Sequence, residues 1–413
     1  MRDDQVSADK SLLSFELISL YAVALLAFCN IAVFYSFHPY MEKIGIPAQW
    51  RGLLLSMEPL AALVLRPMIS PRLHLRNGVR VMAVSLVLII MALVGYRFAT
   101  TVPSLVMVRL VHGTGFVALV SGAAAVFVHF VPQGRSAAAF GFFTIMTQAP
   151  FAIMPPVMEL LLRYCRNEAV AYAWVSLIML PAIFLLYPLQ RRIRKVPVET
   201  PPAVPSGFSR IREALQSPDV RRLLLVNLMF FMAVTTIYFF LKDFALAIHM
   251  DRPGLFFTVY ICSMLAVRAL GTSFFDKLDK RKSIAHSLLV LAGCLALLGQ
   301  TEAEWAVLGL AVVYGGCLGA AMPLINSAMF LASQPQSRGL NTNLLLSTID
   351  AGYVAGPLFG GALLATGLSL SSLFLAAAGF AFLACVLMVR TRLTGSAEPQ
   401  STLSIPAVSA ENK

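Results

Sequence analysis

Two short stretches of the 413-residue chain carry nearly the same four residues: Pro132-Gln133-Gly134-Arg135 and Pro335-Gln336-Ser337-Arg338. Each follows a long apolar run, and the two are 203 positions apart. Two arginines near the ends of other apolar runs, Arg66 and Arg268, repeat with an offset of 202. Self-similarity at one spacing is typical of two copies of a structural unit in the same order. The sequence therefore predicts two matching halves.

The composition places these halves in a membrane. Hydrophobic residues make up 58% of the chain and charged residues 13%, whereas soluble proteins are about 45–50% apolar and about 25% charged. A bilayer-spanning helix needs about 20 apolar residues, so about twelve spans use up the apolar content. The predicted spans are residues 14–38, 48–70, 78–97, 103–131, 136–162, 169–189, 221–246, 254–275, 283–300, 305–332, 341–366 and 369–390.

The spans divide the chain into two bundles of six. Residues 1–190 form the predicted N-terminal bundle and residues 221–392 the C-terminal bundle. A basic and proline-rich cytoplasmic linker, 191–220, joins them, and residues 393–413 are expected to be a disordered cytoplasmic tail. The predicted fold is an all-α membrane protein of twelve helices in two pseudo-symmetric six-helix bundles.

Lysine and arginine are distributed unevenly between the two sides of the membrane. The net charge is +12. With the N-terminus inside, 22 of the 32 basic residues fall in cytoplasmic segments, seven on the opposite side and three within spans. Because positive residues accumulate on the cytoplasmic side, we expect both termini there and the protein in the inner (plasma) membrane. Topology explains the positive charge, so no nucleic-acid partner is predicted.

Motifs of enzymes and metal sites are missing from the sequence. The six cysteines are scattered, and no His, Cys, Asp or Glu cluster has metal-ligand spacing. The phosphate-binding loop, the Gly-x-Ser-x-Gly elbow and the His-Glu-x-x-His motif do not occur. We therefore predict no enzymatic activity, no metal and no cofactor.

Four motifs resemble those of a known transporter family. Arg76-Asn77-Gly78-Val79-Arg80 is similar to the basic end of the family's Gly-x-Leu-Ala-Asp-Arg-x-Gly-Arg-Arg motif, and Gly271 with 276–281 is similar to its second copy. Residues 109–115 resemble the Arg-x-x-x-Gly-x-Gly motif of helix 4. Residues 352–361 resemble the Gly-x-x-x-Gly-Pro-x-x-Gly-Gly motif that exporters carry in helix 5, although helix 5 here lacks those glycines.

Over nearly its whole length the chain resembles the major facilitator superfamily. The resemblance implies a substrate between the halves near mid-bilayer and access that alternates as the halves rock. We expect a monomeric secondary transporter of a small organic solute, with proton-coupled efflux by antiport as the leading interpretation. An uptake symporter or facilitator of an organic anion is the alternative on the same fold. A non-transporting membrane receptor or scaffold is the alternative from another class.

Charged residues within the spans are the strongest candidates for function, since each costs about 2.5–3.5 kcal/mol to insert. Glu58 lies near the middle of its span, and Arg109 and His112 reach a similar depth one turn apart. We predict a Glu58–Arg109 pair in which Glu58 binds and releases a proton. A permanent buried pair that fixes helix packing is the alternative.

Asp350 is the other acidic residue within a span. Arg268 enters the membrane from the same side, so we expect a second cross-helix pair between Asp350 and Arg268. At the corresponding place in the first half stands Gln148. This asymmetry is compatible with an asymmetric substrate and equally with a structural pair.

The remaining candidates form three groups. Polar residues expected to line the cavity are Asn30, Tyr35, Gln148, Thr235, Thr236 and Tyr238. Residues expected in inner-loop turns that latch the halves, as the resemblance implies, are Arg76, Gly78, Arg80, Gly271, Asp276, Lys277 and Arg281. Residues expected to allow close packing of the eleventh helix, or to seal it against proton leak, are Gly352, Gly356, Pro357 and Gly360.

Overall fold

The computed structural model describes residues 12, 14–132, 135–194, 208–275, 277–334 and 337–391. Within these ranges every regular element is a helix. Asp276, residues 195–207 of the predicted linker and the predicted tail 393–413 lie outside the described residues.

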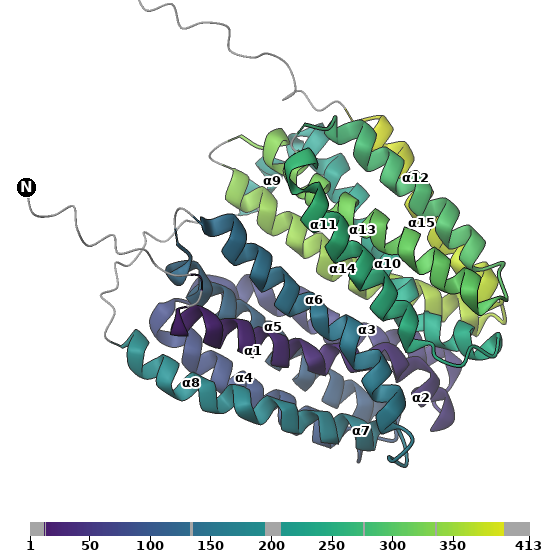
Figure 1. Ribbon diagram of the computed structural model, residues 1–413, viewed down its shortest axis with the longest axis horizontal. Coiled ribbons are helices and arrows are strands. Elements are labelled where there is room, and N and C mark those ends of the chain that lie inside the picture. The colour runs from purple at the N-terminus through teal and green to yellow at the C-terminus, as the bar shows by residue number, and fades with distance from the viewer. Residues whose placement is uncertain are drawn as a thin grey trace, which may run out of the picture.

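The first half contains six membrane-crossing helical paths, some of them interrupted by a short 3-10 turn. Figure 1 shows these helices as one bundle. Their bounds are α1 (Phe15–Ala32), η1 (Val33–Ser36), α2 (Phe37–Lys43), α3 (Ala48–Ile69), η2 (Ser70–Arg72), α4 (Leu75–Gly95), α5 (Val102–Phe130), α6 (Ser136–Leu161), α7 (Glu168–Val175), η4 (Ser176–Ile178) and α8 (Met179–Ile193).

The second half is a separate bundle beside the first (Figure 1). A short helix precedes it in the chain. The helices are α9 (Phe208–Gln216), α10 (Pro218–Ala247), α11 (Gly254–Phe275), α12 (Lys280–Leu298), α13 (Glu304–Ala332), α14 (Arg338–Ala365) and α15 (Leu370–Val389). The all-helical fold with two bundles is as predicted.

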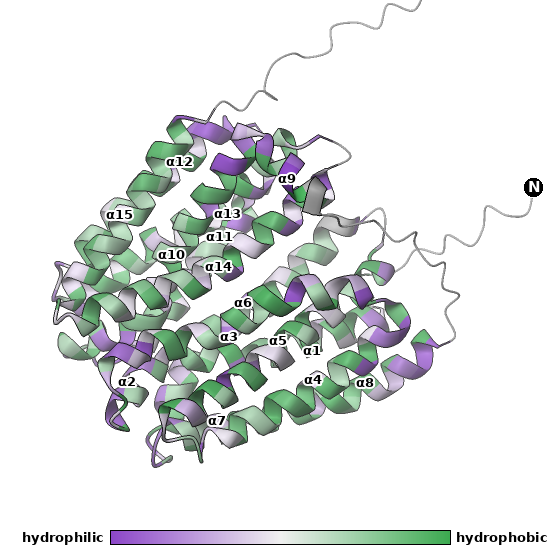
Figure 2. Cartoon of the chain, turned by 180° about the vertical axis from the view of Figure 1, so that it is seen from behind, coloured by the Kyte–Doolittle hydropathy of each residue, from purple (hydrophilic) through white to green (hydrophobic). Residues whose placement is uncertain are grey.

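Eleven helical segments of the described chain are long and apolar enough to cross a membrane. The remaining long helix is α14, whose first half carries polar residues such as Asn341, Asn343 and Asp350 and which packs along α3 and α10. Figure 2 shows hydrophobic residues along the helices and hydrophilic residues gathered mainly at their ends. The eleven segments and α14 together form the twelve-helix architecture.

The first predicted span ends too early. The sequence placed its end at residue 38, because polar residues follow, but the helical path continues through η1 and α2 to Lys43. His38 pairs with Asp243 of the other half at 3.0 Å, so its polarity marks an interface and does not mark the end of the span. The sixth span is similarly longer than predicted and runs through α7, η4 and α8 to Ile193.

The two halves pack together at one end and separate toward the other. We call the end at which α3 and α11 begin the α2 end, and the opposite end the α9 end. Among the side chains that the structure describes, buried positions end at Ala62 in α3 and at Met264 in α11, and within α6 they resume at Pro150 after the unburied stretch 140–149. Because the unburied sections all lie toward the α9 end, the halves are closed at the α2 end.

Candidate functional site: the interface between the halves

The crossing of α3 and α14 forms the first of two seams between the halves. At the α2 end, Gly52 lies so close to α14 that a Cβ there would be 2.9 Å from the Gly361 Cα. One turn further, the Ser56 hydroxyl donates to the Val354 carbonyl at 2.8 Å. Toward the α9 end, Arg66 donates two hydrogen bonds to Asp350, at 2.7 and 3.1 Å. This seam therefore ends in an ion pair that joins the two halves.

The second seam, between α6 and α11, repeats the first at an offset of 202. Gly254 takes the place of Gly52, and a Cβ there would be 2.8 Å from the backbone of Pro155 and Pro156. Thr258 replaces Ser56, and its hydroxyl donates to the Ala152 carbonyl at 2.6 Å. The two seams thus share their glycine contact and their hydroxyl–carbonyl bond.

The predicted pair between Asp350 and Arg268 is wrong. Asp350 is bound by Arg66 from the other half, and the Arg268 guanidinium donates to the Met322 sulfur at 3.0 Å within its own half. Because Arg66 and Arg268 are equivalent positions of the repeat, they lie at the same depth, and depth alone could not show which of them pairs with Asp350. The choice depends on which helices cross, since α14 packs along α3 and shares no such seam with α11.

Glu58 and Arg109 lie together as predicted, but a proline in α3 decides what Arg109 binds. Pro59 has no N–H, so the Leu55 carbonyl loses its helical donor. Arg109 donates to that carbonyl at 2.8 Å and to the Leu54 carbonyl at 3.1 Å. Its distance to the Glu58 carboxylate is longer, 3.9 Å. Arg109 thus binds the α3 backbone first and Glu58 second.

His112 belongs to a buried polar chain behind this pair. Its Nε2 is 2.6 Å from the Asn30 side-chain oxygen, and its Nδ1 is 3.4 Å from the Tyr96 hydroxyl. Gly113, next along α5, packs against the Glu58 backbone, where a side chain would not fit. Asn30, predicted to line a cavity, is instead fully buried and holds His112.

The second half replaces this charged cluster by neutral residues. At the same offset of 202, Tyr260 stands for Glu58, Ala311 for Arg109 and Tyr314 for His112. The rings of Tyr260 and Tyr314 meet edge to face with centroids 5.2 Å apart. Gly315 packs against the Tyr260 backbone just as Gly113 packs against Glu58. The architecture is repeated, but the charged cluster of Glu58 and Arg109 has a neutral counterpart in the second half.

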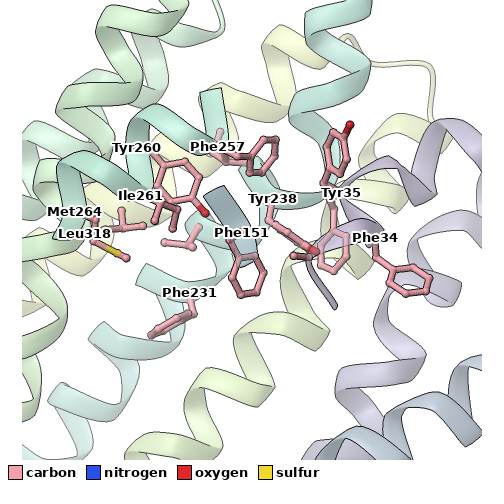
Figure 3. Close-up of a cluster of buried hydrophobic side chains, with 14 of the residues drawn as sticks. Phe34, Tyr35, Phe151, Phe231, Tyr238, Phe257, Tyr260, Ile261, Met264 and Leu318 are labelled. Carbon is pink, nitrogen blue, oxygen red and sulfur yellow. The ribbon is translucent and has the colours of Figure 1, made fainter. Parts of the chain in front are cut away.

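Aromatic side chains from both halves close the interface between the seams (Figure 3). Tyr35 packs edge to face on Phe257 at 5.2 Å, and Phe151 packs in the same way on Tyr238 at 5.7 Å. The Tyr238 hydroxyl donates to the Ile31 carbonyl across the interface at 2.6 Å. These rings block passage toward the α2 end.

The other predicted cavity residues differ in their placement. Thr235 donates to the Gly352 carbonyl at 3.2 Å and Thr236 to the Met232 carbonyl at 2.9 Å, so both bind backbone within the second half. Tyr35 donates to the Pro155 carbonyl at 3.1 Å. Gln148 lies partly exposed in the section of α6 that faces away from the closed end.

Several charged residues at the α2 end were missed by the sequence prediction. Lys242, counted among the basic residues on the non-cytoplasmic side although the predicted span 221–246 contains it, lies buried within α10 and stacks on the Tyr35 ring at 4.9 Å. Glu159 of α6 accepts from the Gly254 N–H at 2.6 Å and so caps the start of α11 in the other half. His38 and Asp243 form the cross-half pair described above. Because these charged residues lie close to predicted loops, the sequence did not indicate that they are buried.

The predicted gate turns are not turns. Gly78 lies inside α4, where it packs against Gly122 of α5, and Gly271 lies inside α11. α4 begins before Gly78 and α11 ends after Gly271, because helical hydrogen bonding continues through both glycines. Arg76, Arg80 and Lys277 are exposed and Arg281 is half-buried. Their predicted role as a latch stays a prediction.

The glycine–proline motif of α14 packs as predicted. A side chain at Gly352 would meet Phe231, one at Gly356 would meet Thr235 and one at Gly360 would meet Phe240, all of α10. Pro357 presents its carbonyl to Gly52 of the other half. The motif therefore brings α14 close to α10 on one side and to α3 on the other.

Comparison with known proteins agrees with this architecture. The family model of the Major Facilitator Superfamily matches residues 20–300 and 253–409. No curated protein sequence matches the chain.

Similar solved structures include three transporters, and all three are under 25% identical, so the likeness is one of fold. A point mutant of the nucleoside transporter NupG has a TM-score of 0.72 at 12% identity, covering 91% of this chain and 99% of its own. A bacterial homologue of the human lysosomal transporter Spinster, in an inward-facing and occupied conformation, gives 0.69 at 14% identity, with 93% and 98% covered. The human organic anion transporter MFSD10 gives 0.64 at 13% identity, with 91% and 99% covered. Together with the family match, the paired seams and the twelve helices identify the chain as a member of the Major Facilitator Superfamily, with the fold of a multi-pass membrane transporter.

Proposed function

We propose that the chain is a proton-coupled secondary transporter that exports a small organic solute by alternating access. The observation that carries the proposal is the Arg66–Asp350 ion pair between the halves. It is the last polar contact of the α3–α14 seam before the halves separate toward the α9 end.

The ion pair is well placed to couple a proton to the motion of the halves. Opening the α2 end breaks the Gly52 and Ser56 contacts and changes the crossing of α3 and α14, and we propose that this shift parts Arg66 from Asp350. A buried carboxylate that loses an arginine partner favours its protonated form. Asp350 would therefore exchange Arg66 for a proton as the halves rearrange.

Glu58 is a second carboxylate within reach of the same charges. Arg109, Asp350 and Arg66 are all close enough for their charges to act on it. Because Arg109 is held mainly by the α3 backbone, Glu58 is only loosely paired, at 3.9 Å. We therefore propose that Glu58 and Asp350 share the proton-coupling role.

The side of access and the substrate class are inferred from sidedness and charge. By the distribution of lysine and arginine, the α9 end faces the cytoplasm. A solute would then enter from the cytoplasm in the observed conformation. Within the spans the three arginines, Arg66, Arg109 and Arg268, outnumber the two acids Glu58 and Asp350, and this excess of positive charge favours an anionic or zwitterionic solute. That one similar fold is an organic anion transporter is compatible with this choice.

The test is reconstitution into proteoliposomes that contain a pH-sensitive dye, with a panel of organic anions, nucleosides and cationic drugs. We expect one class to move protons in the opposite direction to the solute. Asp350→Asn and Glu58→Gln should abolish proton movement while solute exchange in counterflow continues. Glu302→Gln, which changes an exposed acid in the α12–α13 loop, is the matched control and should retain both.

Each other outcome selects an alternative. Proton and solute movement in the same direction supports the uptake symporter. Solute flux without proton movement supports a facilitator. No flux for any class, with folded protein in the vesicles, supports a receptor or scaffold. Unchanged proton coupling in both acid variants would remove the two carboxylates from the mechanism.

A further inference from the structure

We propose that His38, Glu42 and Asp243 form a Zn²⁺ site that bridges the two halves at the α2 end. His38 and Glu42 lie one turn apart on α2, and Asp243 lies on α10 of the other half. One ligand atom from each lies within 4.8 Å of the others. A neutral imidazole and two carboxylates are a ligand set that zinc binds well.

The distances need little adjustment. Ligands about 2.0–2.1 Å from a tetrahedral zinc ion lie about 3.3 Å from one another. The His38 Nδ1 and the Asp243 Oδ1 are already 3.0 Å apart. The Glu42 side chain is 61% exposed, so it can turn toward the ion without repacking the core. A water molecule from the exposed side would complete the tetrahedron.

An unsatisfied atom points to the missing partner. The second carboxylate oxygen of Asp243 is buried and has no hydrogen-bond partner among the described residues. A buried carboxylate oxygen without a partner costs roughly 1–3 kcal/mol or more. Coordination of a cation would satisfy it.

One ion pair competes with the metal for Glu42. Glu42 binds Arg51 at 3.1 Å. Arg51 also donates to the Ile46 carbonyl at 2.9 Å, so it retains a partner when Glu42 turns to the ion. The aromatic ring of Phe240 packs against His38 at 4.9 Å and holds the imidazole in place.

The site has a mechanical consequence because its ligands come from both halves. An ion that binds only when α2 and α10 are together stabilises the conformation closed at the α2 end, by an amount that grows with ion concentration. If the chain transports as proposed, Zn²⁺ on that side would inhibit transport. Binding itself does not depend on the proposed function, so the two can fail separately.

The experiment uses the purified full-length chain with an affinity tag that contains no histidine. Zn²⁺ binding is measured by competition with a metallochromic indicator, and the thermal midpoint is measured with Zn²⁺ and with Mg²⁺. We expect one saturable Zn²⁺ site and a higher midpoint with Zn²⁺ only, because Mg²⁺ prefers all-oxygen sites. His38→Gln and Asp243→Asn should weaken Zn²⁺ binding by about tenfold or more.

The controls separate this site from adventitious binding. His286→Gln removes an exposed histidine on α12 and should leave binding unchanged. Glu42→Gln changes an exposed ligand, so it tests the site even if a substitution at His38 or Asp243 prevents folding. Equal Zn²⁺ affinity and stoichiometry in the wild type and in Glu42→Gln and His38→Gln would overturn the proposal.

Discussion

The two seams of the interface are alike at the α2 end and different toward the α9 end. Both have a glycine against the backbone of a proline-containing helix, Gly52 in one and Gly254 in the other. Both have a hydroxyl that donates across the interface one turn further on. Where the first seam continues to the Arg66–Asp350 pair, the second has Arg268 and Gln148 at the equivalent positions, and Arg268 turns to its own half.

This difference separates what the fold requires from what is particular to this chain. The shared contacts are those that let two bundles meet closely at one end, so the repeat preserves them. In the second seam Gln148 stands in the position of Asp350 and Arg268 donates to Met322 of its own half, so the repeat does not preserve this ion pair. A repeat position that carries Asp350 in one half and the uncharged Gln148 in the other is therefore the clearest mark of a specific function.

The largest expected effect comes from filling the glycine contact. Gly52→Leu places a side chain against the α14 backbone, and overpacking of this kind costs about 1–3 kcal/mol, which shifts closure of the α2 end by roughly 5- to 150-fold. Gly254→Leu should do the same at the other seam. Maleimide labelling of a single cysteine, Ser56→Cys in a cysteine-free background, should become faster. Gly141→Leu, where nothing lies within 4 Å, is the control; equal labelling in all variants would contradict the closed contact.

Breaking the ion pair should affect only the first seam. Arg66→Gln leaves Asp350 without its partner, and removal of one partner of a buried pair costs about 3–5 kcal/mol. Because the Arg66 side chain is 25% exposed, we expect a value at or below the lower end. The thermal midpoint in detergent measures this, and Arg66→Gln with Asp350→Asn should recover part of the loss. If Arg268→Gln destabilised the chain as much as Arg66→Gln, the two seams would not differ as described.

The Leu55 carbonyl, which Pro59 leaves without a helical hydrogen-bond donor, gives a smaller and more specific prediction. Arg109→Lys keeps the charge but loses the planar fork that reaches two carbonyls, and an unsatisfied buried acceptor costs roughly 1–3 kcal/mol. Pro59→Ala restores an N–H to the Leu55 carbonyl, so Arg109→Lys should cost less in that background. Thermal unfolding of the wild type, the two single variants and the double variant measures the coupling between the two substitutions. Arg163→Lys, at an exposed arginine, should be silent.

The smallest effect distinguishes the two hydroxyl bonds. Ser56→Ala and Thr258→Ala each remove one bond across the interface, and such bonds in membranes are worth about 0.6 kcal/mol on average. Thr258→Ala should cost more, because Pro156 leaves the Ala152 carbonyl without a helical donor, whereas the Val354 carbonyl keeps that of Leu358. Precise thermal midpoints of both variants decide this. A larger loss for Ser56→Ala would mean that the freed carbonyl finds another donor.

Much of the fold was predictable from the sequence because it depends on local patterns. The apolar runs predicted the helix now seen as α11 at 254–275 with the observed bounds, and the offset of 202 predicted the pairing of equivalent positions. That Glu58 and Arg109 lie close together was predictable, because they reach a similar depth in the membrane on two helices of the same half. The partner of Asp350 was not, since Arg66 and Arg268 are equivalent in depth and only the crossing of α3 with α14 separates them.

Residues near predicted loops were the hardest to place. His38 is the last residue of the predicted first span, and Lys242 was counted on the non-cytoplasmic side although the predicted span 221–246 contains it. Both are buried because the opposite half covers them, and a partner 205 positions away leaves no local signal. Arg109 was correctly singled out, but its main partners are backbone carbonyls, which a side-chain pattern does not reveal.

The Arg66–Asp350 pair also imposes an order on the making of the protein. Its partners are 284 residues apart, so at about 5–20 residues per second Asp350 is synthesised roughly 15–60 s after Arg66. During this interval Arg66 has no carboxylate partner from α14. Since Arg66 lies near the end of α3, its long side chain can reach the headgroup region while it waits. The eleventh span then draws the arginine inward, so assembly of the two halves is completed only once nearly the whole chain has been inserted.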